Sequence, residues 1–202
     1  IKKNKKLNKV LNIQKQNSII KKLDFSLTTD QIKSLKEINN DLSSSNKMFR
    51  LLQGDVGSGK TIVSLLAAYN SVNAGFQVAV MAPTEILARQ HFTFAKKIFS
   101  KNLRLELISG KSIYKEKKVI LDNLCKHKID IIFGTHAIFQ KKVNFKRLGL
   151  IIIDEQHKFG VNQRKRLSDK GGNDCDVLLM TATPIPRTLT MTIYGDMDLS
   201  II

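Results

Sequence analysis

The sequence is poor in cysteine and histidine. Its two cysteines, Cys125 and Cys175, lie far apart, and neither belongs to a Cys-x-x-Cys pair or stands beside clustered histidines. The four histidines show no metal-ligand spacing either. These gaps argue against a disulfide framework and a zinc site, and they fit a reducing, cytoplasmic setting.

Long apolar runs are also missing. No run approaches the ~18 consecutive apolar residues that a membrane-spanning helix requires, so no membrane partner is expected. Residues 1–22 contain eight lysines and no acid, but they lack the apolar core and the cleavage site of a secretory signal. Because the chain begins with Ile1 rather than Met, we interpret it as a piece of a longer protein.

Acidic residues are scarce relative to basic ones. The 202 residues include 34 Lys and Arg against 17 Asp and Glu, for a net charge of +17. Such an excess attracts polyanions, of which nucleic acid is the commonest in a cell. The alternative is a compositional bias toward Lys, Ile and Asn that carries no function. The hydrophobic share of 42% and the charged share of 25% are typical of a globular chain of one domain, with or without a tail.

Short apolar runs alternate with segments of helical period. The β-like runs lie at 48–53, 77–81, 103–108, 129–133, 148–153 and 177–181, and the helical segments lie near 29–42, 60–73, 84–99, 112–127 and 185–194. The run 148–153 is apolar except for Gly149, as expected for a strand covered on both faces. This alternation predicts an α/β fold of three layers, with a mostly parallel sheet and helices on both faces. Ligands of such sheets bind at the carboxyl ends of the strands.

A glycine-rich segment between the first predicted strand and its following helix matches the phosphate-loop pattern G-x-x-x-x-G-K-[ST]. In this pattern Lys60 reaches the β- and γ-phosphates of a nucleotide such as ATP, and the Thr61 hydroxyl binds Mg²⁺. The loop backbone wraps the phosphates, which adds five candidate nucleotide-binding residues: Gly54, Asp55, Gly57, Ser58 and Gly59. The alternative is a glycine-rich turn with an accidental lysine. The context favours a P-loop NTPase domain.

Two carboxylates, Asp154 and Glu155, follow the buried strand 148–153 directly. They should therefore lie at the same edge of the sheet as the phosphate loop. Asp154 suits Mg²⁺, held mainly through its water shell, and Glu155 suits the orientation and deprotonation of an attacking water. An acidic loop without function is the alternative. Beside a phosphate loop, the pair predicts hydrolysis as well as binding.

Thr28 and Gln31 allow two interpretations. The spacing Thr28-x-x-Gln31 is that of a capping box, in which the glutamine side chain returns to the N-cap amide. A glutamine amide can instead pair with N6 and N7 of adenine. Phe25, as a ring-stacking neighbour, favours base recognition.

Together, the phosphate loop, the Asp154-Glu155-Gln156-His157 segment and Thr181-Ala182-Thr183-Pro184 resemble the first RecA-like motor domain of superfamily-two helicases. The strings MAPTEILARQH (81–91), FGTHAIFQ (133–140), DEQHKFGVNQR (154–164) and MTATPIPRTLTMTIYGDMDLS (180–200) resemble more specifically the RecG family of branched-DNA helicases. The string TATPIPRTL is shared mainly with transcription-repair coupling factors. Lys158 departs from the family pattern, which has an arginine there, and this argues against a bidentate role for the position.

The resemblance implies roles for individual residues. Gln31 matches the adenine-reading glutamine, and Asp154 and Glu155 match the magnesium and catalytic carboxylates. The DNA-facing motifs are matched by Thr84, with its neighbours Pro83 and Glu85, and by Gly134, Thr135 and His136. The motifs that couple nucleotide to DNA are matched by Gln156, His157, Thr181, Thr183 and Arg187. Plainer alternatives are a helix cap at Thr84, an ordinary polar residue at His136 and packing roles for Gln156 and His157.

The resemblance also implies domains and partners. Residues 25–202 would form the first motor domain, and residues 1–24 a basic linker or helix from an upstream DNA-binding wedge domain. A second RecA-like domain is expected outside these 202 residues, and its arginine is typically worth ~10³ to 10⁵ in rate, so weak or no ATP hydrolysis is expected of this chain alone. The implied partners are double-stranded and branched DNA, at stalled forks and Holliday junctions, together with both missing domains.

Two other functions remain open from the sequence. One is the motor of a transcription-repair coupling factor. The other is a nucleotide-dependent module that binds nucleic acid without hydrolysis, against which Glu155 argues, because a clamp needs no water-activating carboxylate.

Overall fold

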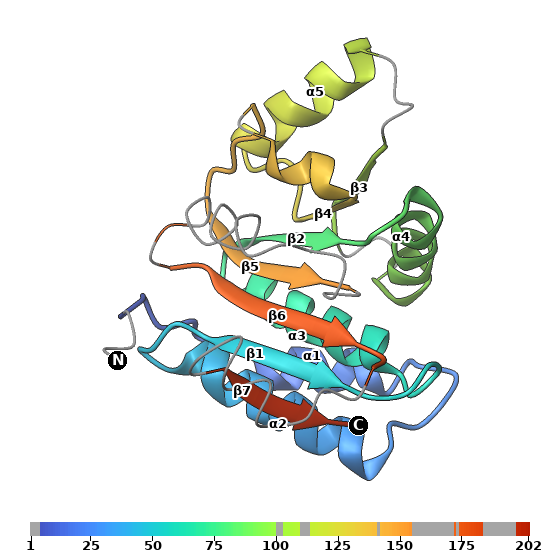
Figure 1. Cartoon of the computed structure of the whole chain (residues 1–202). Coiled ribbons are helices and arrows are strands. Elements are labelled where there is room, and N and C mark those ends of the chain that lie inside the picture. Colours follow the sequence, from blue (N-terminus) through green and yellow to red (C-terminus); the bar gives the residue numbers. More distant parts are fainter. Residues whose placement is uncertain are drawn as a thin grey trace.

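The computed structural model describes residues 5–99, 103–109, 114–140, 142–154, 172, 174–183 and 197–202. Within these ranges, one sheet has the strand order β3-β4-β2-β5-β6-β1-β7 (Figure 1). Every neighbouring pair in this sheet is parallel, which confirms the predicted architecture. The strands are β1 (Phe49–Gln53), β2 (Gln77–Met81), β3 (Leu105–Ile108), β4 (Ile131–Gly134), β5 (Leu148–Ile153), β6 (Asp176–Thr181) and β7 (Asp198–Ile201).

Helices cover both faces of the sheet, as predicted. Alternate strand residues, such as Leu51 and Leu52, enter two separate apolar cores. One core takes residues from α1 (Ile13–Ile20), α2 (Thr29–Ser43), α3 (Lys60–Asn73) and α4 (Glu85–Phe99). The other takes residues from α5 (Tyr114–Cys125) and the short 3₁₀ helix η1 (His136–Phe139). In Figure 1, α1, α2 and α3 gather near β1, β6 and β7, whereas α5 lies at the β3 end of the sheet.

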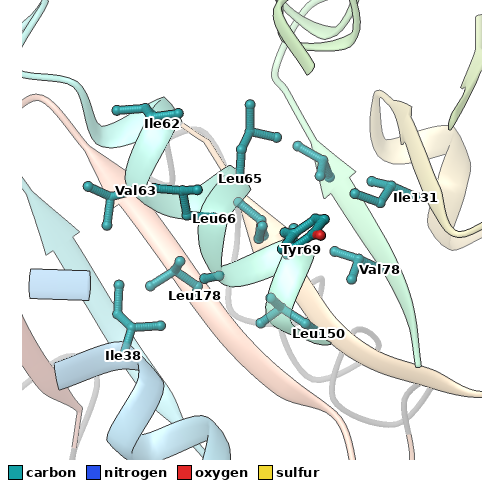
Figure 2. Packing of buried hydrophobic residues seen from close by; sticks show 14 of the residues in the cluster. Ile38, Ile62, Val63, Leu65, Leu66, Tyr69, Val78, Ile131, Leu150 and Leu178 are labelled. Atoms are coloured by element: carbon teal, nitrogen blue, oxygen red, sulfur yellow. The ribbon is translucent and has the colours of Figure 1, made fainter. Parts of the chain in front are cut away.

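Helix α3 forms the centre of the first core. It is apolar around most of its circumference, and Figure 2 shows its side chains packed between Ile38 of α2 and the strand residues Leu178 and Leu150. Leu66 and Leu178 have no exposed surface. Truncating such a side chain to Ala typically costs about 2–5 kcal/mol. This packing fixes the start of α3, where the phosphate loop ends.

The parallel register brings the carboxyl ends of neighbouring strands to one edge. Gln53 of β1 pairs with Thr181 of β6, and Ile153 of β5 pairs with Leu179 of β6. Residues that follow β5, β6 and β1 therefore lie side by side at this edge, as the sequence predicted for the phosphate loop and Asp154.

The elements differ from the prediction mainly at their ends. Helix α5 (Tyr114–Cys125) ends two residues before the expected 127, and β3 begins at Leu105 rather than Leu103. Strand β7 was not predicted, because it is a four-residue edge strand that pairs only with β1. The helix expected at 185–194 lies outside the described residues.

The lysine-rich start of the chain makes contacts that its composition does not indicate. It contains helix α1, which Asn12 caps by accepting a hydrogen bond from the Lys15 amide. Before this helix, Lys6 Nζ donates to both carboxylate oxygens of Asp176, at 2.7 and 2.6 Å. Lys9 Nζ donates to the same carboxylate at 2.6 Å, and all three side chains are buried. Residues 5–9 are thus fastened to the amino end of β6.

In the part of the chain that the structure describes, no helix has the length and apolar character needed to cross a membrane.

Candidate nucleotide site

The phosphate loop connects β1 to α3 and has the backbone of an anion cradle. Gly57 and Gly59 have φ angles of 82° and 87°, in the left-handed region that favours glycine. A Cβ atom on Gly59 would also clash with Nε2 of Gln31. Gly59 caps α3 without a side chain, so the first amides of the helix point toward the loop and favour a bound anion.

Two side chains of the loop fit a phosphate. Lys60 Nζ lies over the loop and donates to the carbonyl oxygens of Gly54, at 2.6 Å, and Asp55, at 2.8 Å. Ser58 Oγ is buried and has no hydrogen-bond partner among the described residues. An ammonium group, an orphaned hydroxyl and backbone amides that converge on one loop form a donor set suited to a triphosphate.

Gln31 joins helix α2 to this loop. The capping box is formed, since the Thr28 amide donates to Gln31 Oε1 at 3.0 Å and the Gln31 amide donates to Thr28 Oγ1 at 3.2 Å. In addition, Gln31 Nε2 donates to the Ser58 carbonyl oxygen at 2.8 Å. An amide oxygen accepts two bonds and an amide nitrogen donates two. The cap and adenine recognition are therefore compatible, and adenine recognition stays a prediction.

Asp154 directly follows β5, two strands away from β1 in the sheet order. Its amide donates to the Met81 carbonyl oxygen at 2.9 Å, which continues the pairing with β2. Its Oδ2 lies 2.8 Å from Nε2 of His91 on α4. Glu155, Gln156, His157, Lys158 and Arg187 lie outside the described residues.

Thr181 and Thr183 lie between the phosphate loop and Asp154. The Gly54 amide donates to the Thr181 carbonyl oxygen at 3.3 Å. The hydroxyls of Thr181 and Thr183 are 2.9 Å apart, and the Thr183 amide donates to Thr181 Oγ1 at 3.2 Å. The last residue of β6 is therefore bonded directly to the start of the phosphate loop.

The expected DNA-facing residues lie at the same edge, beyond β5. Thr84 directly precedes α4 and its hydroxyl accepts a hydrogen bond from the Leu87 amide at 3.3 Å, which makes it a helix cap. Gly134 ends β4, and its carbonyl oxygen accepts from the Ala82 amide at 2.9 Å. A Cβ on Gly134 would lie 2.6 Å from the Ile108 carbonyl oxygen, so only glycine fits. Thr135 and the exposed His136 follow and start η1.

Sequence reasoning missed His91. Its partner Asp154 is 63 residues away, and a lone histidine within a helical segment carries no motif. The only available signal was its position, since it falls on the buried stripe of α4 among Ala88, Ala95 and Phe99.

The fold and the loop define a class of protein: P-loop nucleotide-binding domains with a three-layer α/β architecture. A family model described as DEAD/DEAH box helicase matches residues 28–192. The chain belongs to this family.

The more similar relatives carry one name. The chain is 57% identical over 180 residues to "ATP-dependent DNA helicase RecG" of Streptococcus pneumoniae, an alignment that covers 89% of this chain and 26% of the relative. It is 52% identical over 184 residues to the protein of that name from Bacillus subtilis, covering 91% of this chain and 27% of the relative. The chain thus spans about a quarter of the length of these relatives.

Solved structures agree on the fold. The structure "RecG bound to three-way DNA junction" superposes with a TM-score of 0.86 at 44% identity, covering 98% of this chain and 27% of that one. The DEAD-box helicase Mss116 bound to ssRNA and UDP-BeF superposes with a TM-score of 0.73 at 21% identity, covering 96% of this chain and 43% of that one. The second similarity shows the fold alone.

Proposed function

We propose that this chain is the first RecA-like motor domain of an ATP-dependent DNA helicase or translocase of the RecG kind, which remodels branched DNA in recombination and repair. One observation carries the proposal: the order of groups along one edge of the sheet. The phosphate loop follows β1, Thr181 ends β6 and Asp154 follows β5. Next come Thr84 after β2 and Gly134 at the end of β4. Nucleotide groups and candidate DNA contacts thus form one continuous row.

The nucleotide half of the row has the groups that ATP hydrolysis requires. Lys60 would exchange its two carbonyl partners for the β- and γ-phosphates, and Ser58 Oγ and the loop amides would donate to the same anion. The Gln31 side chain can still donate one hydrogen bond and accept one hydrogen bond, which adenine would use. Thr61, in the first turn of α3, and Asp154 offer the hydroxyl and carboxylate oxygens that Mg²⁺ prefers. When bound, Mg²⁺ would neutralise phosphate charge.

Glu155, next to Asp154 in the sequence, is assigned as the base that orients and deprotonates water. Gln156, His157, Thr183 and Arg187 are assigned to coupling, because Thr181 already joins the phosphate loop to the neighbouring strand end. Thr84, Gly134, Thr135 and His136 are assigned to the DNA backbone, since helix starts and exposed amides favour phosphates.

We further propose the domain arrangement: residues 25–202 form the motor domain, residues 1–24 connect it to an upstream wedge domain, and a second RecA-like domain supplies an arginine to the γ-phosphate. A protein that carries this chain together with that second domain is called the two-domain protein below. The arginine is typically worth about 10³- to 10⁵-fold in rate, so turnover should depend on the second domain.

The test is Glu155→Gln in the two-domain protein. Loss of the base should abolish DNA-stimulated ATP turnover while the affinity for a fluorescent ATP analogue stays unchanged. Asp122→Asn, which removes an exposed ion pair between Asp122 of α5 and Lys126, is the matched control and should keep full turnover. Retained turnover in Glu155→Gln would contradict the assignment of the base.

A further inference from the structure

His91 occupies an unusual position for a polar side chain. Helix α4 presents a buried stripe made of Ala88, His91, Ala95 and Phe99, and His91 is the only member that can form side-chain hydrogen bonds. The residue is only 8% exposed. A buried imidazole costs free energy unless it finds a partner, so an apolar residue would be the cheaper choice for packing alone.

The partner of His91 is the carboxylate that the proposed function assigns to Mg²⁺. Nε2 of His91 lies 2.8 Å from Oδ2 of Asp154, and the two side chains are 9% and 13% exposed. An ionised carboxylate only accepts hydrogen bonds, so Nε2 is the donor. The Asp154 amide is bonded to the Met81 carbonyl oxygen, and the His91 imidazole is bonded to the Asp154 carboxylate. Both the backbone and the side chain of Asp154 are therefore held in place.

Helix α4 is firmly seated where it carries His91. The neighbouring Phe92 ring packs edge-on against Phe133 of β4, with ring centres 5.8 Å apart. Ala95 and Phe99 are fully buried in the core of that face. The same helix begins at the cap residue Thr84, seven residues before His91, which is about two helical turns. One helix therefore carries both the cap at the DNA-facing motif and the imidazole.

We infer that His91 is a positioning residue for the metal site: it orients the Asp154 carboxylate and joins it to the helix that begins at the DNA-facing motif. The inference rests on the proposed function and deepens it. Partners that orient a metal-ligating carboxylate typically change metal affinity or activity by about 10- to 100-fold when they are removed. His91 would thereby make the Mg²⁺ site sensitive to what contacts the start of α4.

The experiment compares His91→Leu with His91→Gln in the two-domain protein. Leucine suits the buried stripe and preserves folding but has no donor, whereas the glutamine Nε2 reaches nearly the same place as the imidazole Nε2 and can donate to Asp154. Binding of a fluorescent ATP analogue is measured in EDTA and across a Mg²⁺ titration. Circular dichroism and urea denaturation check that both variants are folded.

We expect affinity in EDTA to be unchanged in both variants. In His91→Leu, the Mg²⁺ concentration for half-maximal binding should rise about tenfold, and His91→Gln should return it close to wild type. Stimulation of turnover by branched DNA should fall more than basal turnover in the leucine variant. A Mg²⁺ titration of His91→Leu that matches wild type would overturn the inference, and so would an equal shift in both variants.

A parallel Lys60→Ala variant separates this inference from the proposed function. If Lys60→Ala leaves nucleotide affinity unchanged, the nucleotide site itself is wrongly assigned and both ideas fail. If Lys60→Ala weakens binding while His91→Leu behaves as wild type, the site stands and only the role of His91 is refuted.

Discussion

Strand β6 begins at Asp176 and ends at Thr181, and its two ends have different polar chemistry. At the amino end, the Asp176 carboxylate is fully buried and accepts hydrogen bonds from Lys6, Lys9 and the Met48 amide. At the carboxyl end, Thr181 borders a loop in which the Ser58 hydroxyl is buried without a partner among the described residues. The carboxylate at the amino end finds its hydrogen-bond partners within the chain, whereas the loop at the carboxyl end has hydrogen-bond donors placed for a ligand.

The buried charges at the amino end of β6 are unequal in number, because the two ammonium groups of Lys6 and Lys9 face the single carboxylate of Asp176. Burial lowers the pKa of Lys6 below its ordinary value of 10.5, and the Asp176 carboxylate acts in the opposite direction. Lys9 Nζ also lies 4.7 Å from the centre of the Phe76 ring, which adds a cation–π contact. The comparison teaches that substitutions at the amino end should affect folding, and substitutions at the carboxyl end should affect binding.

Asp176→Asn should have the largest effect, because it leaves Lys6 and Lys9 buried without an anion. Breaking a buried ion pair typically costs about 3–5 kcal/mol of the free energy of unfolding. Urea denaturation of this chain measures the loss. The exposed pair of Asp122 and Lys126 provides the control, and Asp122→Asn should cause no measurable loss. A loss below about 1 kcal/mol for Asp176→Asn would contradict the claim that the amino end of β6 contributes mainly to folding.

Lys60→Ala should show the reverse behaviour. Losing a charged donor to phosphate typically costs about 1.5–3 kcal/mol, so nucleotide affinity should fall about 10- to 100-fold. The free energy of unfolding should fall less than in Asp176→Asn, since the Gly54 and Asp55 carbonyl oxygens that Lys60 contacts are uncharged and its removal leaves no buried charge behind there. Titration of a fluorescent ATP analogue measures the affinity, with Lys36→Ala on the exposed side of α2 as the control. A large stability loss with unchanged affinity would reverse the comparison.

Gln31 lies at the carboxyl edge but has both roles, and two substitutions separate them. Gln31→Ala removes the capping box and should cost about 1 kcal/mol of stability. Gln31→Glu keeps a capping-box acceptor for the Thr28 amide but removes the Nε2 donor, so stability should be largely retained. Both should reduce the preference for ATP over GTP about tenfold, measured by competition binding. An unchanged preference would leave Gln31 as a cap only.

The smallest effect is expected in the rate of cysteine modification, which reports only on the surroundings of each thiol. Cys175 precedes Asp176 and is fully buried, and burial raises the pKa of its thiol to about 12, so it stays protonated at pH 8. Cys125 is exposed on α5. A thiol reagent at pH 8 should therefore modify Cys125 quickly and Cys175 only when the amino end opens, as mass spectrometry would show. Asp176→Asn should speed modification of Cys175 alone; equal rates at both cysteines would mean that the amino end is not closed.

The sequence predicted what depends on local pattern. The strands β1, β2 and β5, the helices α2 and α3, and the position of Asp154 at the edge of the phosphate loop follow from periodicity and from the rule for parallel sheets. The spacing of Thr28 and Gln31 offered the capping box as one of two interpretations, and the structure forms it. These features need only residues that lie close together in the chain.

What the sequence did not reveal depends on contacts across long separations. Lys6 and Asp176 are 170 residues apart, and nothing in a lysine-rich start distinguishes a buried lysine from an exposed one. His91 and Asp154 likewise meet only because α4 packs against β3 and β4 in the folded sheet. Strand β7 was missed because four residues at an edge give too little alternation to register as a strand.

The most direct test of one shared nucleotide site is a crystal structure of this chain with Mg²⁺ and a non-hydrolysable ATP analogue. We expect Lys60 Nζ to leave the Gly54 and Asp55 carbonyl oxygens for the β- and γ-phosphates. Thr61 should bind the magnesium ion, and Asp154 should approach it directly or through one water. A triphosphate seated on the loop with the Asp154 carboxylate too distant to reach its magnesium would contradict the shared site and the motor function built on it.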